Sequence, residues 1–403
     1  MQVLIIGAGC TGLLLAQGLK RAGINATVYE RETPEYCTGR PREWGMSLHW
    51  GIEAIEKVLP EELRARIREA WCDPCWEGEL VLKHYHGHTG DLAFETQLGD
   101  GTRVSRRKMR ELFKEGLDVR YGKKLATIKQ DESSVTAIFE DGTEATGALL
   151  IGCDGARSVV RELLLGHERA QNTFLDVSLF NFPCSFDAEI AKRIRAQHPI
   201  FFNSYQPEGW MFWLSAQDVA DVDKPETWLF QLMFSWVGPP RQEELATKEA
   251  RTAFLKSKAS LYVDPWRTVL QAIPDDVSFG LDRIAEWKPF DWSSEPLASR
   301  VTLAGDAAHA MAPYRGQGLN NGLEDAACLK ELLANMQDAT QALGPSLHQY
   351  EAEMRQRSLK EIEISRASAY ISHDFEQLMN GPLAKHGVRK NVDIDEKPKD
   401  NHL

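Results

Sequence analysis

Short apolar runs that end in or beside glycine are the most regular pattern along the chain. Residues 2–6 (QVLII), 149–152 (LLIG) and 301–304 (VTLA) are almost wholly apolar, which is typical of strands buried in a parallel sheet. The first run is followed by a glycine-rich turn at 7–12 and then, over residues 13–23, by apolar positions at helical spacing. Residues 26–30 (ATVYE) are predicted to form the next strand. This alternation of strand and helix predicts an α/β fold.

The turn after the first run has the spacing GxGxxG, in the strand–turn–helix context that gives this pattern meaning. Gly7 allows the tight turn, Gly9 lets the backbone approach a pyrophosphate, and Gly12 lets helix and strand pack closely. The phosphates would then meet free amides at the helix N-terminus. Glu30 ends the next strand, where a carboxylate accepts hydrogen bonds from ribose hydroxyls. The pattern predicts an adenine dinucleotide in a Rossmann-like domain, without separating NAD from FAD.

The two later runs both end in an aspartate beside a glycine. Asp154 follows the second run and Asp306 the third, and a further helix is predicted to begin near Leu319, just after Gly318. A helix N-terminus approached by glycine suits negative charge. Since the first turn already takes the phosphates, this second helix end is free for the other end of the ligand. A reduced flavin, which carries negative charge near N1 and O2, fits there.

Residues 170–295 differ from the flanking segments in their pattern of hydrophobic residues. In 228–236 (WLFQLMFSW) large apolar residues alternate with others, which predicts a strand with one aromatic face, and 209–214 (GWMFWL) is predicted to pair with it. The aromatic face either covers an apolar substrate pocket or packs in the core of the domain. We expect core packing for most of these side chains. The segment 134–146 alternates around Asp141-Gly142 and predicts a hairpin.

Charge and composition exclude several classes. The 403-residue chain has a formal net charge of −12, which argues against nucleic-acid binding. No apolar run reaches the roughly 18 residues of a membrane helix, and no secretory signal is recognised, so we expect a cytoplasmic protein without an integral membrane segment. The seven cysteines are scattered, which favours a reducing compartment. Cys72 and Cys75 are not expected to act as a redox pair, and no ligands show zinc spacing, so no metal is expected.

Three motifs together carry a resemblance to a known family. These are GAGCTG with Glu30, IGCDGARSVVR at 151–161, and AGDAAHAMAPYRGQGLNNGLEDA at 304–326. In this order, and over nearly the whole chain, they resemble the signatures of the single-component FAD-dependent aromatic hydroxylases, the group A flavoprotein monooxygenases. Residues 40–50 (RPREWGMSLHW) are similar to a segment of fungal secondary-metabolite members. Ala310 stands where many members have proline.

The resemblance implies roles for individual residues. Asp306 would bind the ribityl and pyrophosphate region, and Gly318 and Leu319 would present amides to the flavin ring. Arg106 matches the arginine of the family's R-x-x-L pattern, with Met109 in place of leucine; otherwise it is one solvated charge on a basic helix face. The full set of expected FAD-binding residues is Gly7, Gly9, Thr11, Gly12, Glu30, Arg31, Gly45, Arg106, Asp154, Asp306, Gly318 and Leu319.

Other candidates are linked to the co-substrate and to catalysis. Arg157 matches an arginine that the family ties to cofactor and NAD(P)H. Arg40 and Arg42 either line the nicotinamide approach or belong to a solvated loop. Because the flavin carries the chemistry, the catalytic side chains stay unknown. His309 and Tyr314 are the candidates, and for His309 a loop-bracing role is the alternative.

These patterns divide the chain into five parts. Residues 1–168 and 297–340 are expected to form the FAD-binding domain, and 169–296 an inserted antiparallel-sheet domain for the substrate. Residues 341–387 are expected to form a C-terminal helical region with one long helix, and 388–403 a disordered tail. The sequence does not give the oligomeric state.

The resemblance implies that NAD(P)H reduces non-covalently bound FAD and that O2 then forms a flavin C4a-hydroperoxide. One oxygen atom would be transferred to an apolar, electron-rich small molecule by hydroxylation or epoxidation. Only one GxGxxG turn is present, so NADPH or NADH is expected as a transient co-substrate. The sequence names neither the substrate nor the preferred nicotinamide.

Three alternative functions are compatible with the same FAD-binding fold. A flavin halogenase would carry W-x-W-x-I-P, which is absent, because 209–214 reads GWMFWL. A flavin-dependent reductase or oxidase would lack oxygen insertion. A flavoprotein recruited for non-redox secondary-metabolite chemistry, such as cyclisation, would not consume NAD(P)H rapidly. The fold alone does not choose among them.

Overall fold

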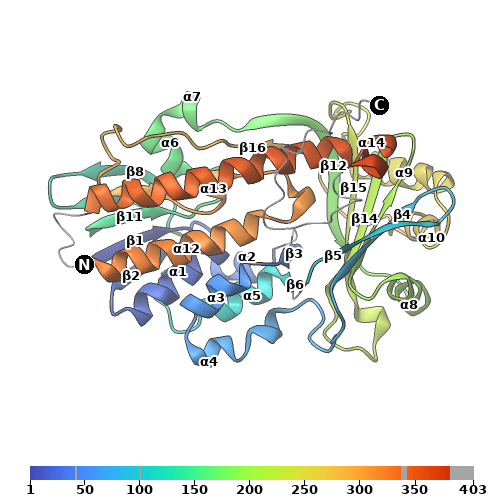
Figure 1. The fold of residues 1–403 in the computed structure, drawn as a ribbon, viewed down its shortest axis with the longest axis horizontal. Helices are drawn as coiled ribbons and strands as arrows, with labels where there is room; N and C mark the ends of the chain where they lie inside the picture. The colour runs from blue at the N-terminus through green and yellow to red at the C-terminus, as the bar shows by residue number, and fades with distance from the viewer. Residues whose placement is uncertain (41–42, 100, 337–342, 382–403) are drawn as a thin grey trace, which may run out of the picture.

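The structure is a computed structural model that describes residues 1–40, 43–99, 101–336 and 343–381. Arg42 and the expected disordered tail at 388–403 lie outside the described residues. The expected mixed α/β architecture is confirmed, with two large sheets side by side and long helices running along the molecule (Figure 1). The boundaries of the five expected parts stay a prediction.

A parallel sheet of five strands has the strand that precedes the GxGxxG turn at its centre. Its order is β17-β11-β1-β2-β7, and every neighbouring pair is parallel. The carboxyl ends of these strands therefore lie at one edge, so the three glycine loops meet there although they are far apart in sequence. The strands are β1 (Gln2–Ile6), β2 (Asn25–Tyr29), β7 (Val119–Arg120), β11 (Leu149–Gly152) and β17 (Val301–Leu303).

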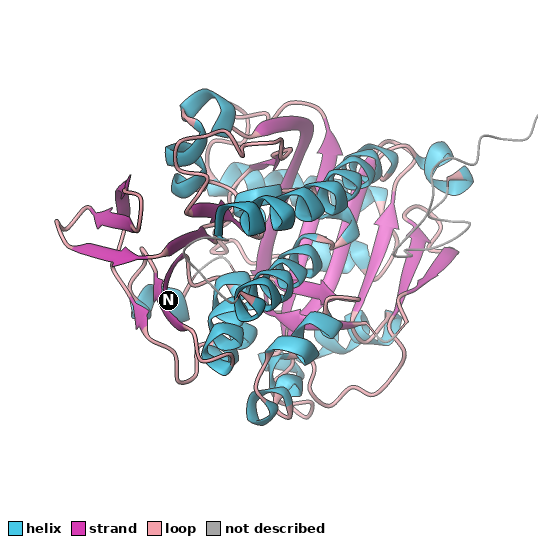
Figure 2. Ribbon diagram, turned by 60° about the vertical axis from the view of Figure 1, so that its left-hand side comes forward, coloured by secondary structure: helices cyan, strands magenta, loops and turns pink. Residues whose placement is uncertain are grey.

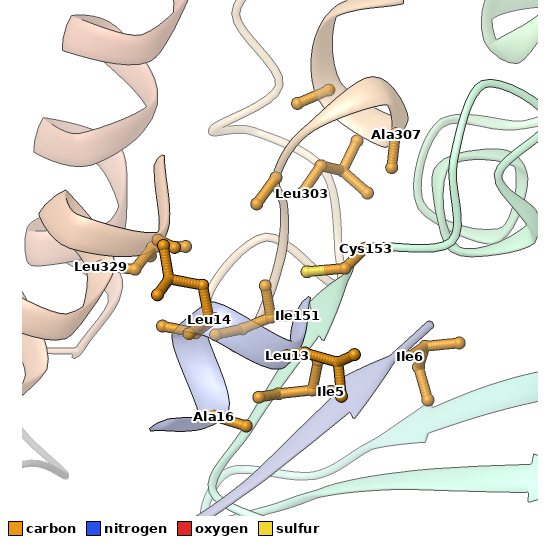
Figure 3. Packing of buried hydrophobic residues seen from close by; sticks show 14 of the residues in the cluster. Ile5, Ile6, Leu13, Leu14, Ala16, Ile151, Cys153, Leu303, Ala307 and Leu329 are labelled. Carbon is orange, nitrogen blue, oxygen red and sulfur yellow. The ribbon is translucent and has the colours of Figure 1, made fainter. Parts of the chain in front are cut away.

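Helices cover this sheet and bury its apolar strands. Helix α1 (Cys10–Arg21) starts directly after the GxGxxG turn, and its Leu13 and Leu14 lie against Ile5 and Ile151 of the central strands (Figure 3). Helix α12 (Gly318–Asn335) packs on α1, and α13 (Leu343–Ile371) runs beside it (Figure 1). The remaining helices of this region are α2 (Pro34–Thr38), α3 (Ile52–Val58), α4 (Glu61–Arg64), α5 (Arg106–Phe113), α6 (Val159–Leu165), α7 (His167–Ala170) and α11 (Asp306–His309). The last helix, α14 (Phe375–Asn380), packs instead against the other large sheet.

A second sheet of seven strands has the order β16-β12-β15-β14-β13-β4-β5. Its neighbouring pairs are antiparallel except β13 with β4. Its strands lie side by side with helices packed against them (Figure 2). The strands are β4 (Val81–His86), β5 (Leu92–Gln97), β12 (Thr173–Cys184), β13 (Phe201–Tyr205), β14 (Trp210–Asp218), β15 (Leu229–Val237) and β16 (Asp282–Glu286).

The two faces of the seven-stranded sheet differ in chemistry. The alternating aromatic residues of β15 form one buried cluster with helices α8 (Ala188–Gln197), α9 (Lys248–Ser257) and α10 (Trp266–Gln271). Core packing is therefore the role of these side chains. The other face carries the alternate residues of the same strand, Gln231, Met233 and Ser235. Met233 on this face packs with Ala312 and Tyr314, which belong to the loop before α12.

Two small sheets and four 3-10 turns complete the described part of the fold. β8 (Leu125–Gln130), β9 (Val135–Phe139) and β10 (Glu144–Gly147) are antiparallel, and Gly142 turns the predicted hairpin with φ +81°. β3 (Gly45–Leu48) pairs with β6 (Thr102–Ser105), next to β14 of the large sheet. The 3-10 turns are η1 (Ile67–Ala70), η2 (Pro225–Thr227), η3 (Lys258–Leu261) and η4 (Pro313–Arg315). Within the described ranges, no helix has both the length and the apolar character needed to span a membrane.

Candidate active site

One groove runs along the carboxyl edge of the parallel sheet and is lined by all three glycine loops. Met46 and Arg110 also line it. Most of the residues expected to bind cofactor or co-substrate come together here. They are Gly7, Gly9, Thr11, Glu30, Arg31, Arg40, Arg106, Asp154, Arg157, Asp306, Gly318 and Leu319.

The three glycines of the first loop have different surroundings. Gly7 has φ +110°, and a Cβ atom there would lie 2.4 Å from the Cys153 carbonyl oxygen. A Cβ at Gly12 would lie 2.3 Å from the Gly7 carbonyl oxygen, so Gly12 serves close packing and does not line the groove. Gly9 is open, because a Cβ there meets only the Cys153 oxygen, at 3.9 Å. The space beside Gly9 therefore lets a ligand approach the backbone, as a pyrophosphate requires.

Glu30 lies at the end of β2 and is held in place by the backbone. Its Oε2 accepts from the Ala8 amide at 2.9 Å, and its Oε1 from the Glu32 amide at 3.0 Å. Each carboxylate oxygen keeps a lone pair for another donor. A fixed carboxylate beside the groove fits the two hydroxyls of an adenosine ribose.

Asp154 shapes the second loop. Its Oδ1 accepts from the Ser158 hydroxyl at 2.5 Å and its Oδ2 from the Val159 amide at 2.7 Å, which closes the turn before α6. Burial raises the pKa of Asp154, and these hydrogen bonds lower it. Arg157 follows on the exposed rim of the groove.

Asp306 opens α11, and its side chain projects into the groove, where it is exposed. The surrounding protein nevertheless raises its pKa through desolvation, and the nearby positive charges of His309 and Arg106 lower it. The start of α12 lies close by, since a Cβ at Gly318 would be 3.5 Å from Asp306 Oδ1. No side chain caps α12, so its first amides are available to an anionic or polar ligand atom.

Arg106 is paired and not solvated. Its Nε and Nη2 atoms donate to the two oxygens of Glu43 at 3.1 and 2.9 Å, and its guanidinium lies 4.6 Å from the centre of the Trp44 ring. The bidentate pair fixes the arginine in one orientation at the groove wall. The alternative of a free charge on a helix face is therefore wrong for Arg106.

Arg161 does not line the groove but supports two of its loops, a role that sequence reasoning missed. Its guanidinium is buried and donates to the carbonyl oxygens of Ala170, Ala307 and Ala156 at 3.0, 3.0 and 2.7 Å, and to Asn172 Oδ1 at 3.0 Å. It thereby joins the second glycine loop to the third. The available signal was its place in α6, where an arginine stands between apolar residues on the buried side of the helix.

His309 does not line the groove. It is fully buried, and its Nε2 lies 2.6 Å from Asp325 Oδ2, which also accepts from the Gly305 amide at 2.7 Å. The other oxygen of Asp325 accepts from Arg357 of α13 at 2.7 Å. These contacts brace the turn that carries Asp306, so the bracing role considered for His309 is the one its contacts support.

Gly45 and Tyr314 also lie outside the groove lining. The Gly45 amide donates to Gln231 Oε1 at 2.9 Å, and the same oxygen accepts from Arg103 at 2.7 Å. A Cβ at Gly45 would lie 2.9 Å from Arg103 Nε, so glycine here admits the guanidinium that ties β3 to the large sheet. Tyr314 packs against the large sheet instead. Over the described part of the chain, no group of His, Cys, Asp and Glu is arranged to hold a metal ion.

The sequence matches one family model and many curated proteins. The model, described as an FAD binding domain, matches residues 1–43, 101–269 and 275–364. FAD-dependent monooxygenase phnB of Penicillium herquei is 36% identical over 391 residues, covering 96% of this chain and 94% of that protein. FAD-dependent monooxygenase cctM of Talaromyces islandicus is 35% identical over 395 residues, covering 96% and 97%.

The fold is similar to that of solved flavoproteins. HpxO of Klebsiella pneumoniae, solved with FAD and uric acid, has a TM-score of 0.75 at 22% identity, covering 96% of this chain and 92% of that one. A salicylate hydroxylase in complex with its substrate has a TM-score of 0.73 at 20% identity, covering 96% and 93%. At these identities the likeness shows the fold alone.

Proposed function

The chain belongs to the FAD-dependent monooxygenase family, and on that premise we propose that it uses NAD(P)H and O2 to insert one oxygen atom into an apolar, electron-rich small molecule. The insertion is a hydroxylation or an epoxidation. One observation carries the proposal: a single groove joins an open glycine turn, a fixed carboxylate and an uncapped helix start.

The groove residues fit non-covalent FAD. The backbone beside Gly9 and the start of α1 would hold the pyrophosphate, and Glu30 the adenosine ribose. Asp306 would accept hydrogen bonds from the ribityl chain, and the first amides of α12, at Gly318 and Leu319, would meet the polar edge of the ring. When bound, the flavin supplies electron transfer and oxygen activation, and the protein supplies orientation and exclusion of water.

The nicotinamide co-substrate is proposed to bind transiently at the groove rim. Arg40 lies at the rim, and its buried Nε has no hydrogen-bond partner among the described residues. Arg157 is exposed on the same groove. Guanidinium groups bind phosphate through paired, charge-assisted hydrogen bonds, which suits the diphosphate of NADH or NADPH.

The decisive experiment is a substrate screen on the FAD-loaded protein. Electron-rich aromatics and alkenes are tested for stimulated NAD(P)H consumption, and products are analysed by mass for the gain of one oxygen atom. NAD(P)H consumption that yields only hydrogen peroxide with every compound would favour the oxidase or reductase alternative. Absence of NAD(P)H oxidation would favour non-redox chemistry.

A second experiment concerns the order of events. We propose that bound substrate makes the flavin accessible to NAD(P)H, so that reduction is faster with substrate than without it. Stopped-flow reduction without oxygen measures both rates. Equal rates would contradict the proposal that substrate controls flavin reduction, but they would leave the FAD assignment intact.

Arg40→Ala should raise the NAD(P)H concentration for half-maximal reduction about tenfold. Arg241→Ala, which changes an exposed arginine outside the groove lining, is the control.

A further inference from the structure

Met46 is the one methionine that lines the cofactor groove among the described residues. It lies in β3, where neighbouring side chains point to opposite sides of the strand. Ser47 lies on the side of the large sheet, since its Oγ is 3.5 Å from Nη1 of Arg103. Met46 packs instead on the apolar core of the cofactor-binding part and is only half-buried. Its side chain is therefore accessible from the groove.

Met46 belongs to the end of the groove where the flavin ring is proposed to lie. Gly318 and Leu319, at the start of α12, line the same groove, and β3 packs against α12. Met46 and Leu319 also pack on the same apolar core. A reactive oxygen species formed at the ring would therefore be released beside a thioether.

Two cysteines also line the groove but are less suited to react with a peroxide. Thiolates and not thiols are the nucleophiles in such reactions. Burial raises the pKa of Cys10 to about 11 and holds the pKa of Cys153 well above its ordinary value, so both thiols keep their protons at neutral pH. A thioether has no proton to lose, and its lone pairs are available at any pH. Met46 is therefore the sulfur of the groove that is best placed to be oxidised.

The other methionines provide internal comparisons. Met311 lies near the same helix start, because its Cγ is 4.0 Å from a Cβ built at Gly318, but it does not line the groove. Met379 on α14 is half-buried like Met46 and lies outside the groove lining. Four further methionines are buried, namely Met109, Met211, Met233 and Met354.

We propose that Met46 is a self-modification site, at which hydrogen peroxide formed in the groove during turnover without substrate oxidises the thioether to a sulfoxide and thereby weakens FAD binding. The inference rests on the proposed function, which supplies the peroxide: NAD(P)H, one proton and O2 give NAD(P)⁺ and H2O2. A lone pair of the Met46 sulfur attacks one peroxide oxygen. The O–O bond breaks as the S–O bond forms, and the second oxygen leaves as water. The sulfur loses two electrons and the peroxide gains them.

Oxidation changes the chemistry of this wall of the groove. Val104 lies opposite Met46 on β6, and the core on which Met46 packs is apolar. A sulfoxide is a polar acceptor, and an acceptor without a donor is unfavourable in such surroundings. We expect FAD to bind roughly 5- to 150-fold more weakly to the oxidised protein. An enzyme that consumes reductant without forming product would thus switch itself off, and methionine sulfoxide reductase would restore it.

The first test maps the oxidised residues by mass. The FAD-loaded protein turns over NAD(P)H under isotopically labelled O2 without organic substrate, and catalase destroys peroxide that escapes from the groove. Digestion and mass analysis then locate the label. We expect a labelled oxygen on Met46 well before Met311 or Met379. Equal labelling of Met46 and Met379, or oxidation of Cys10 or Cys153 in place of Met46, would overturn the proposal.

The second test follows the FAD content during the same turnover. Met46→Leu conserves volume but removes the thioether, and Met379→Leu is the matched control. The unaltered protein and the control should lose FAD progressively, whereas Met46→Leu should keep its own starting content. Methionine sulfoxide reductase should return the FAD affinity of the oxidised unaltered protein, a readout that needs no variant. Equal loss of FAD in Met46→Leu, or no recovery with the reductase, would contradict the switch.

A third arrangement separates this inference from the proposed function. Since reduction by NAD(P)H is expected to be slow without substrate, the bound flavin is also reduced by light with EDTA, and labelled O2 is then admitted. Label on Met46 in this arm supports the modification even if NAD(P)H reduces nothing, in which case the proposed function alone fails. Peroxide production that leaves Met46 unlabelled overturns the modification alone.

Discussion

The guanidinium group of Arg161 donates to the carbonyl oxygen of Ala307 at 3.0 Å, although the two residues are 146 positions apart in the chain. Arg161 also donates to the Ala156 carbonyl oxygen, so one side chain fixes the distance between the second and third cofactor loops. No carboxylate forms an ion pair with it among the described residues, and its donors are satisfied by carbonyl and amide oxygens.

Replacing Arg161 by methionine should leave several buried carbonyl oxygens without donors. We expect the free energy of unfolding to fall by roughly 3 kcal/mol or more, together with weaker FAD binding. Arg157→Met removes an exposed arginine four positions earlier and should change stability by less than about 0.5 kcal/mol. Chemical denaturation of both variants measures the difference. Equal stabilities would show that the Arg161 network does not hold the loops.

Two alanine substitutions in the first loop should separate folding from cofactor binding. Gly12→Ala places a methyl group against the Gly7 carbonyl oxygen, so α1 has to shift, at a cost of roughly 1–3 kcal/mol of stability. Gly9 has φ −78°, which alanine adopts, and its methyl group would enter the open side of the groove. Gly9→Ala should therefore keep its stability without FAD but bind FAD more weakly. Denaturation of the apoprotein and fluorescence titration with FAD test the pair, and loss of stability in Gly9→Ala would contradict the assignment.

Asp306→Ala should weaken FAD by about 5- to 150-fold, because a cofactor hydroxyl loses its charged acceptor. The fold should survive, since the Asp306 carboxylate projects into the groove. Asp291→Ala, which changes an exposed carboxylate, serves as the control. Titration of the apoproteins with FAD gives both affinities. A folded Asp306→Ala variant with normal affinity for FAD would contradict the proposal that Asp306 contacts the ribityl chain.

The buried contacts of Asp325 should make stability depend on acidity. The positive charges of His309 and Arg357 outweigh desolvation and hold the pKa of Asp325 at about 2, below its ordinary 3.8. A depressed carboxyl pKa stabilises the folded state above the unfolded value, and this contribution disappears as the pH falls from about 4 to 2. It amounts to roughly 2 kcal/mol. Denaturation at pH 7 and pH 3 should show a smaller loss for Asp325→Asn than for the unaltered protein.

If Asp325→Asn does not fold, Arg357→Gln offers a second route. Removing this guanidinium should bring the pKa of Asp325 closer to its ordinary value and shift the acid transition to higher pH. Arg355→Gln, on the same helix but paired only loosely with Asp291 at 3.9 Å, is the control. An unchanged acid transition in Arg357→Gln would exclude Asp325 as the titrating group.

The sequence predicted those helices, strands and turns whose pattern can be recognised from neighbouring residues alone. The apolar runs and the glycine spacing around Gly7 and Gly9 predict β1, the turn and α1, because each depends only on neighbouring residues. For the same reason, the sequence predicts that Asp306 follows a strand and that Leu319 lies near the start of a helix. The alternating residues around Phe230 and Phe234 predicted a strand with an aromatic face.

What the sequence did not reveal depends on distant partners. Nothing near Arg161 indicates that it reaches Ala307, since a lone arginine in a helix is usually a surface charge. Gly45 was expected at the cofactor, but its neighbours are Arg103 and Gln231, which come from other strands. Hydrophobic spacing along a strand separates an apolar face from a more polar one. Only the assembled structure shows which residues from other elements pack on each face.

The parallel order of the central sheet also bears on protein synthesis. β1 emerges from the ribosome well before β17, which supports the Asp306 loop and is made some 300 residues later. A nascent chain can therefore fold strands and hairpins, but it has no complete binding site until the third glycine loop has been made. FAD can therefore join only a chain in which all three glycine loops have been made.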